Sequence, residues 1–213
     1  MREARWSGCL LIGGAVTFWT SWVLMPGVGI TDAALILDLV SQSRHSVLIS
    51  SVLQLCSAAL LAVALPGLAW AFSKKRTPWI SVGVILLSLG VCGDAADTIF
   101  HMMAYEMVGP GAERAQMVPV YQRMQEFDLL FLLPMIFAFF LGGLSLAVGI
   151  ARAGLVSWWN PGLYGVALAV GILGAQIVRA LGQSGRVVGL MVLALVSVSL
   201  AWLGIALTRV SVE

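Results

Sequence analysis

Long apolar stretches alternate with short polar connections along the whole chain of 213 residues. Each stretch can cross a hydrocarbon core about 30 Å thick as an α-helix, because a helix rises about 1.5 Å per residue. The two-residue alternation typical of strands is absent. The pattern therefore predicts an all-α polytopic membrane protein, with one domain over residues 1–213. Its six transmembrane helices are predicted over residues 6–28, 46–72, 77–104, 126–151, 158–178 and 187–208.

The composition leaves no segment for a separate soluble domain, since 60% of the residues are hydrophobic and only 10% are charged. Two connections are nevertheless long. Residues 26–44 include a helix-like pattern over Asp32–Val40, and residues 105–125 include the breaker Gly109-Pro110-Gly111. The net charge of +2 forms no basic stripe, which argues against nucleic acid as a partner. The predicted partner is the lipid bilayer, in which such a bundle can work alone, as a homo-oligomer or in a hetero-oligomer.

The densest basic cluster, Lys74, Lys75 and Arg76, lies between the second and third predicted spans. Positively charged loops favour the cytoplasmic side of a membrane. With six spans, both termini are then predicted to be cytoplasmic as well. Most of the acidic residues fall at the opposite, outer ends of the spans.

Three ionisable residues, Asp94, Asp97 and His101, follow one another at positions i, i+3 and i+7 of the third predicted span and therefore share a helix face. An ionisable group in a membrane costs roughly 2.5 to 3.5 kcal/mol on insertion scales, so it persists where a bundle interior or a cavity receives it. We expect this face to line a polar cavity that opens outward. The residues assigned to that cavity are Arg44, Asp94, Asp97, His101, Arg123, Glu126 and Asp128.

Three chemistries are open for this cavity. It can be a solvated vestibule in which Arg44 or Arg123 pairs the acids. It can hold a divalent metal, because oxygen and imidazole ligands suit such an ion. It can also hold a haem between the chain's two histidines, at the outer ends of neighbouring spans. The metal ligands would be His45, Asp97, His101 and Glu126.

A buried carboxyl group such as Asp94 can also serve as a proton or cation site. Gln54 and Ser50 on the second span can line the same path. The sequence therefore predicts a transporter-like protein or accessory subunit with an outward-facing acidic cavity. The alternative is a metal-dependent membrane enzyme or haem-binding protein that uses His45, Asp94, Asp97, His101 and Glu126. No cofactor is certain.

Two segments carry a resemblance to a known family. They are "SQSRHS" with the following "VLISSVLQLCSAALLAVALPGLAWAF", and the later "FFLGGLSLAVGIARAGLVSWWNP". The layout resembles the small bacterial integral membrane proteins catalogued as domain of unknown function 4386. This resemblance implies a six-span fold in a bacterial plasma membrane. It implies no activity, and no functional residue is carried over from it.

Overall fold

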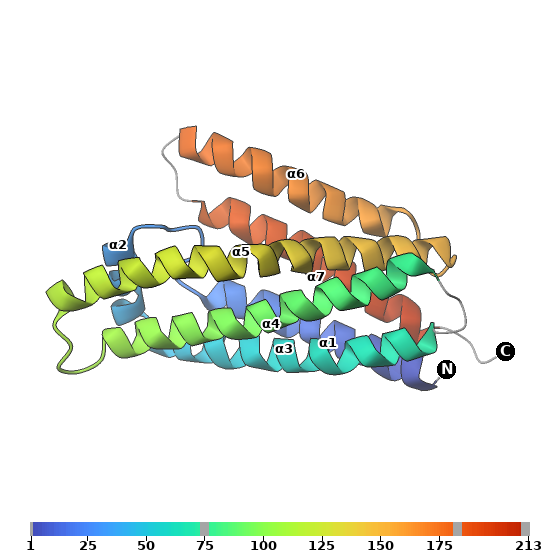
Figure 1. The fold of residues 1–213 in the computed structure, drawn as a ribbon, viewed down its shortest axis with the longest axis horizontal. Coiled ribbons are helices and arrows are strands. Elements are labelled where there is room, and N and C mark those ends of the chain that lie inside the picture. Colours follow the sequence, from blue (N-terminus) through green and yellow to red (C-terminus); the bar gives the residue numbers. More distant parts are fainter. Residues whose placement is uncertain (1, 73–76, 181–184, 210–213) are drawn as a thin grey trace.

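The computed structural model describes residues 2–72, 77–180 and 185–209, and these residues form an all-α fold (Figure 1). The helices are α1 (Arg2–Leu24), α2 (Ala33–Gln42), α3 (Arg44–Ala71), α4 (Pro78–Met107), α5 (Arg114–Arg152), α6 (Trp159–Ala180) and α7 (Arg186–Thr208). The basic cluster predicted to be cytoplasmic, at residues 74–76, lies outside the described residues.

The six long helices pack as a closed ring in the order α1, α3, α4, α5, α6, α7 and back to α1. The short helix α2 packs against α3, α4 and α5 at one end of the bundle, which we call the α2 end. At the opposite end, called the terminal end, α1 begins, α7 ends and α3 gives way to α4 (Figure 1). The start of α1 and the end of α7 therefore lie at the same end of the bundle as the end of α3 and the start of α4 (Figure 1).

Within the described residues, five helical segments are long and apolar enough to cross a membrane: Ala4–Leu24, Arg44–Ala71, Pro78–Met107, Leu130–Arg152 and Arg186–Thr208. The outside of the bundle carries large apolar side chains such as Val63, Ile85 and Leu130, each more than 60% exposed. Soluble monomers rarely expose so much contiguous apolar surface, whereas acyl chains solvate it well. The chain is thus a multi-pass α-helical membrane protein.

The main departure from the predicted boundaries concerns α5. We predicted a span from residue 126 and a connection over 105–125, but α5 already begins at Arg114. The extra turns project beyond the apolar part of the helix, and the Arg114 guanidinium contacts the Asp38 carboxylate of α2 at 2.5 Å. Hydropathy marks where a helix leaves hydrocarbon, not where it ends, so the prediction was wrong on this point. The predicted helix in the first connection is confirmed as α2, with Asp32 as its N-cap.

Glycines allow α4 and α5 to approach closely. A Cβ atom on Gly83 would lie 2.5 Å from the backbone nitrogen of Leu146, and one on Gly142 would collide with the backbone of Leu87. Gly142 and Gly83 therefore allow the two helices to pack backbone against backbone. Helix α4 packs against α5 on one side and against α3 on the other. The face of α4 that carries Asp94, Asp97 and His101, which we call its polar stripe, therefore lies inside the ring.

Candidate functional site: a buried acidic cluster

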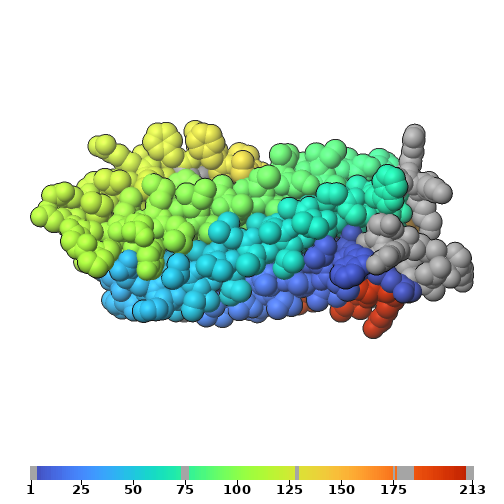
Figure 2. All heavy atoms as spheres, turned by 90° about the horizontal axis from the view of Figure 1, so that it is seen from below, coloured from blue at the N-terminus to red at the C-terminus, as the bar shows by residue number. Residues whose placement is uncertain are grey.

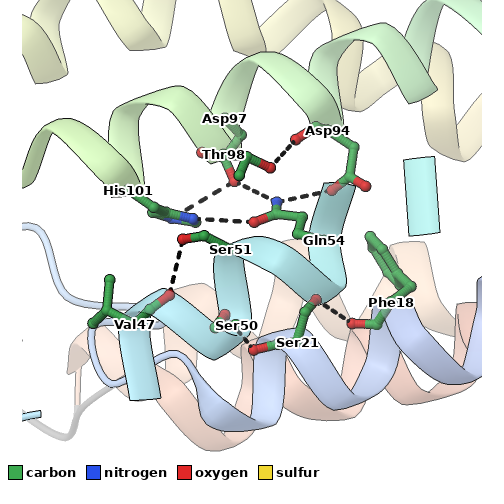
Figure 3. Close-up of polar contacts among 10 residues, drawn as sticks. All are labelled: Phe18, Ser21, Val47, Ser50, Ser51, Gln54, Asp94, Asp97, Thr98 and His101. Carbon is green, nitrogen blue, oxygen red and sulfur yellow. Dashed lines mark hydrogen bonds and ion pairs between the residues drawn. The ribbon is translucent and has the colours of Figure 1, made fainter. Parts of the chain in front are cut away.

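The polar stripe of α4 meets one glutamine of α3 inside the bundle. The Gln54 side chain is 1% exposed, and its Nε2 donates to Oδ1 of Asp94 and to Oδ2 of Asp97, both at 2.9 Å (Figure 3). One amide group thus bridges two carboxylates that lie three residues apart on the neighbouring helix. We call Gln54, Asp94, Asp97 and His101 the acidic cluster.

His101 completes the cluster. Its Nδ1 lies 3.1 Å from Oε1 of Gln54. Since the amide nitrogen of Gln54 is committed to the carboxylates, Oε1 is the acceptor and Nδ1 of His101 is the donor. The other ring nitrogen, Nε2, lies 3.7 Å from Oδ2 of Asp97. At 3.7 Å this second contact is too long for a hydrogen bond, and it is an ion pair only when His101 is protonated.

The charges of the acidic cluster do not balance when both carboxylates are ionised, because its single histidine carries at most one positive charge against two negative ones. Arginine does not make up the difference within the described residues. Arg44 lies over the Tyr105 ring at 4.1 Å and donates to the Tyr105 carbonyl oxygen at 3.3 Å. The vestibule in which Arg44 or Arg123 pairs these acids is therefore not found in the part of the chain that the structure describes.

Asp94 keeps one oxygen free for a further partner. Its side chain is 9% exposed, and its Oδ2 is buried without a hydrogen-bond partner among the described residues. The indole Nε1 of Trp22, on α1, is in the same condition. Buried polar atoms are normally paired, so the unpaired acceptor of Asp94 points to a proton or a donor ligand, and the unpaired donor of Trp22 points to an acceptor.

Two cavities meet at the acidic cluster. The inner cavity, of about 300 Å³, is lined by described residues of α1, α4, α5 and α7, most of them aromatic or aliphatic, together with Asp94 and Asp97. The end cavity, of about 210 Å³, lies toward the α2 end and is lined by Asp97, His101 and Gln125 among others. Asp97 and Trp22 line both cavities, and the Trp22 ring packs edge-on against the His101 ring at 5.7 Å.

The helices α1, α3 and α4 form a continuous face on one side of the molecule (Figure 2). The acidic cluster lies behind this face, because Gln54 of α3 and the polar stripe of α4 point inward (Figure 3). The routes to the cluster are therefore the end cavity and the side of the inner cavity formed by α5 and α7.

Three predicted site residues, Asp94, Asp97 and His101, share one helix face in the structure, as the spacing predicted. The remaining predicted residues do not join them. The side chains of Arg123 and Glu126 are exposed, and neither lines a described cavity. The side chain of Asp128 lies outside the described part of the chain.

The prediction that His45 belongs to the site was wrong. It precedes Gln54 by nine residues, which at about 100° per residue places it half a turn away, on the exposed face of α3. Its imidazole therefore does not face His101, and the haem arrangement between the two histidines is not formed. Among the described residues, no group of three or more histidine, cysteine, aspartate and glutamate side chains could hold a metal ion, so the set His45, Asp97, His101 and Glu126 is not assembled.

Gln54 and Trp22 are the residues whose importance the sequence did not show. Gln54 was expected to line the path, but the structure makes it the bridge of the whole cluster. Its position on a stripe of small polar residues of α3, with Ser50 and Ser57 one turn away on either side, is the signal that could have marked it. Trp22 is one of eight tryptophans and has no distinguishing pattern around it.

The fold and this site define a polytopic α-helical membrane protein with a buried acidic cluster between two cavities. Comparison with known proteins identifies no relative, because no family model, no curated protein and no solved structure matches this chain. The resemblance to the bacterial family described above stays a prediction.

Proposed function

We propose that this protein is a small membrane carrier whose acidic cluster binds a proton or a cation that arrives from the outer side of the membrane. The observation that carries this proposal is the unpaired Oδ2 of Asp94, buried beside a cavity in a cluster that has more negative than positive groups. Such groups are costly in a membrane and are typical of ion and proton pathways.

The hydrogen-bond geometry suits reversible uptake. Asp94 accepts the bond from Gln54 with Oδ1, so a proton or cation can join Oδ2 without breaking that bond. Gln54 holds both carboxylates in place whether Asp94 is charged or neutral. The cluster can therefore change its charge by one unit while its framework stays intact.

The direction of access follows from the topology that we propose. In it, α6 crosses the membrane together with the five long apolar helices, which gives six spans, and the terminal end of the bundle faces the cytoplasm of a bacterium because of the basic residues 74–76. The end cavity then faces outward. It leads to Asp97 and His101, and through them to Asp94, which lies about one turn deeper on α4.

The proposal is tested by charge movement in proteoliposomes on a solid-supported membrane. A jump in outside pH should produce a transient current in the wild type, because protons enter the low-dielectric cluster. The Asp94→Asn variant should show only the current of empty liposomes. Asp38→Asn is the matched control, since Asp38 is a carboxylate at the surface of α2 that pairs with Arg114.

Folding is checked by helix content and by a single symmetric peak in size-exclusion chromatography. His101→Gln provides a second variant in case Asp94→Asn folds poorly, and it should also reduce the current. A well-folded Asp94→Asn protein with the full wild-type current would overturn the proposal. So would a wild type that gives no current at any pH jump.

A further inference from the structure

The inner cavity combines an apolar lining with two carboxylates. Aromatic and aliphatic side chains make up most of its described lining, with Phe18 of α1 stacked on Phe139 of α5 at 5.3 Å and 22° between the ring planes. This stack lies one turn from Trp22 along α1. The carboxylates of Asp94 and Asp97 join this apolar lining from α4. The cavity is therefore apolar along its walls and negatively charged at one side.

Two buried polar atoms belong to residues that line this cavity, and neither has a partner among the described residues: Oδ2 of Asp94, an acceptor, and Nε1 of Trp22, a donor. A buried acceptor on a carboxylate loses its hydration without compensation. A ligand that donates to Oδ2 of Asp94 recovers that loss, and a positively charged donor also neutralises the excess negative charge of the cluster.

We propose that the inner cavity binds a small hydrophobic amine in its ammonium form. The ammonium group donates to Oδ2 of Asp94, and the apolar body of the amine lies between Phe18, Phe139 and Leu132. This inference rests on the proposed function, because it assigns the cation that the acidic cluster takes up. Aromatic faces also attract an ammonium ion, which adds to the match.

Other ligand classes fit the cavity less well. An anion would be repelled by Asp94 and Asp97, and a neutral apolar molecule would leave the cluster's excess negative charge without compensation. A bare metal ion would find too few oxygen donors among the apolar walls. A zwitterionic lipid headgroup would bring a phosphate next to the carboxylates, and no arginine or lysine is among the described lining residues.

The volume of the inner cavity limits the size of the amine, and its position indicates how the amine enters. Its volume of about 300 Å³ corresponds to roughly ten heavy atoms, taking about 30 Å³ for each water-sized group. Leu133 and Ile136, which lie on the α5 side of the cavity, are 44% and 49% exposed on the apolar surface of the bundle. This side of the cavity is thus apolar, so a hydrophobic amine enters here from the lipid acyl chains, whereas a proton arrives through the end cavity.

The test is equilibrium dialysis of the full-length protein in detergent with radiolabelled 2-phenylethylamine. Unlabelled 2-phenylethanol and 3-phenylpropionate serve as neutral and anionic competitors of similar size. We expect saturable amine binding that excess unlabelled amine abolishes and that neither competitor reduces. Asp94→Asn should lose the saturable binding, and Asp38→Asn should keep it.

A second variant tests the cavity without touching the carboxylates. Ile136→Trp adds bulk at the α5 side of the inner cavity and should weaken amine binding. Its matched control is Ile99→Trp, which adds the same side chain on α4 at a site 61% exposed that does not line the cavity. Equal binding by these two variants would count against the inner cavity as the site.

Several results would overturn the inference. Saturable binding that the alcohol or the acid displaces equally well would show apolar partition without recognition of charge. Displacement of the amine by phosphatidylethanolamine, but not by phosphatidylglycerol, would assign the site to a lipid headgroup. If pH-jump currents are normal while the amine does not bind, this inference fails and the proposed function stands. If the currents are absent as well, both fail.

Discussion

Replacing Gln54 by leucine tests whether the acidic cluster stabilises the bundle. Leucine is close to glutamine in volume and keeps the packing of this 1%-exposed site, but it removes every side-chain hydrogen bond. The lost bonds are those to Oδ1 of Asp94 and Oδ2 of Asp97, both 2.9 Å long, and the 3.1 Å bond from His101. The free energy of unfolding should therefore fall.

The size of the loss depends on the charges in the cluster. Hydrogen bonds between membrane helices average about 0.6 kcal/mol, so three neutral bonds would contribute about 2 kcal/mol. A bond to a charged group contributes about 1.5 to 3 kcal/mol. With one carboxylate ionised and the other neutral, as the proposed proton site requires, we expect a loss of about 3 kcal/mol.

The assay is reversible unfolding in mixed micelles with increasing sodium dodecyl sulfate, followed by the helical circular dichroism signal. Gln122→Leu is the matched control, because Gln122 is exposed on the projecting part of α5, and such surface changes usually stay within about 0.5 kcal/mol. A Gln54→Leu protein as stable as this control would refute the argument that Gln54 couples α3 to α4.

Two further predictions concern topology and packing. In a variant whose natural cysteines are replaced by serine, a cysteine at position 111 should react with a membrane-impermeant thiol reagent in intact cells, and one at position 75 should not; the reverse pattern would place the end cavity on the cytoplasmic side. Asn160→Leu should lower the free energy of unfolding by about 1 to 3 kcal/mol, because the fully buried Asn160 donates to the Ser199 carbonyl oxygen at 3.0 Å and accepts from its hydroxyl at 3.1 Å, joining α6 to α7. Unfolding in mixed micelles measures this loss, and an unchanged midpoint would show that α6 is held by apolar contacts alone.

The sequence by itself determined the class of protein and most of its helices. Hydropathy over twenty residues is a local property, and in a membrane the backbone must satisfy its own hydrogen bonds, so a long apolar stretch becomes a helix whatever its neighbours are. The same local geometry placed Asp94, Asp97 and His101 on one face. It also predicted α2, where Asp32 accepts a hydrogen bond from the backbone nitrogen of Leu35.

Only the tertiary structure decided which residues complete the site. Gln54 faces Asp94 because of the rotation of α3 about its axis. The same rotation turns His45 outward, so neither the predicted metal site nor the predicted haem site is formed. Trp22 reaches the cluster because the ring of helices brings α1 close to the polar stripe of α4. Sequence spacing gives directions along one helix, but the rotation and neighbours of each helix follow from the packing of side chains that are distant in the chain.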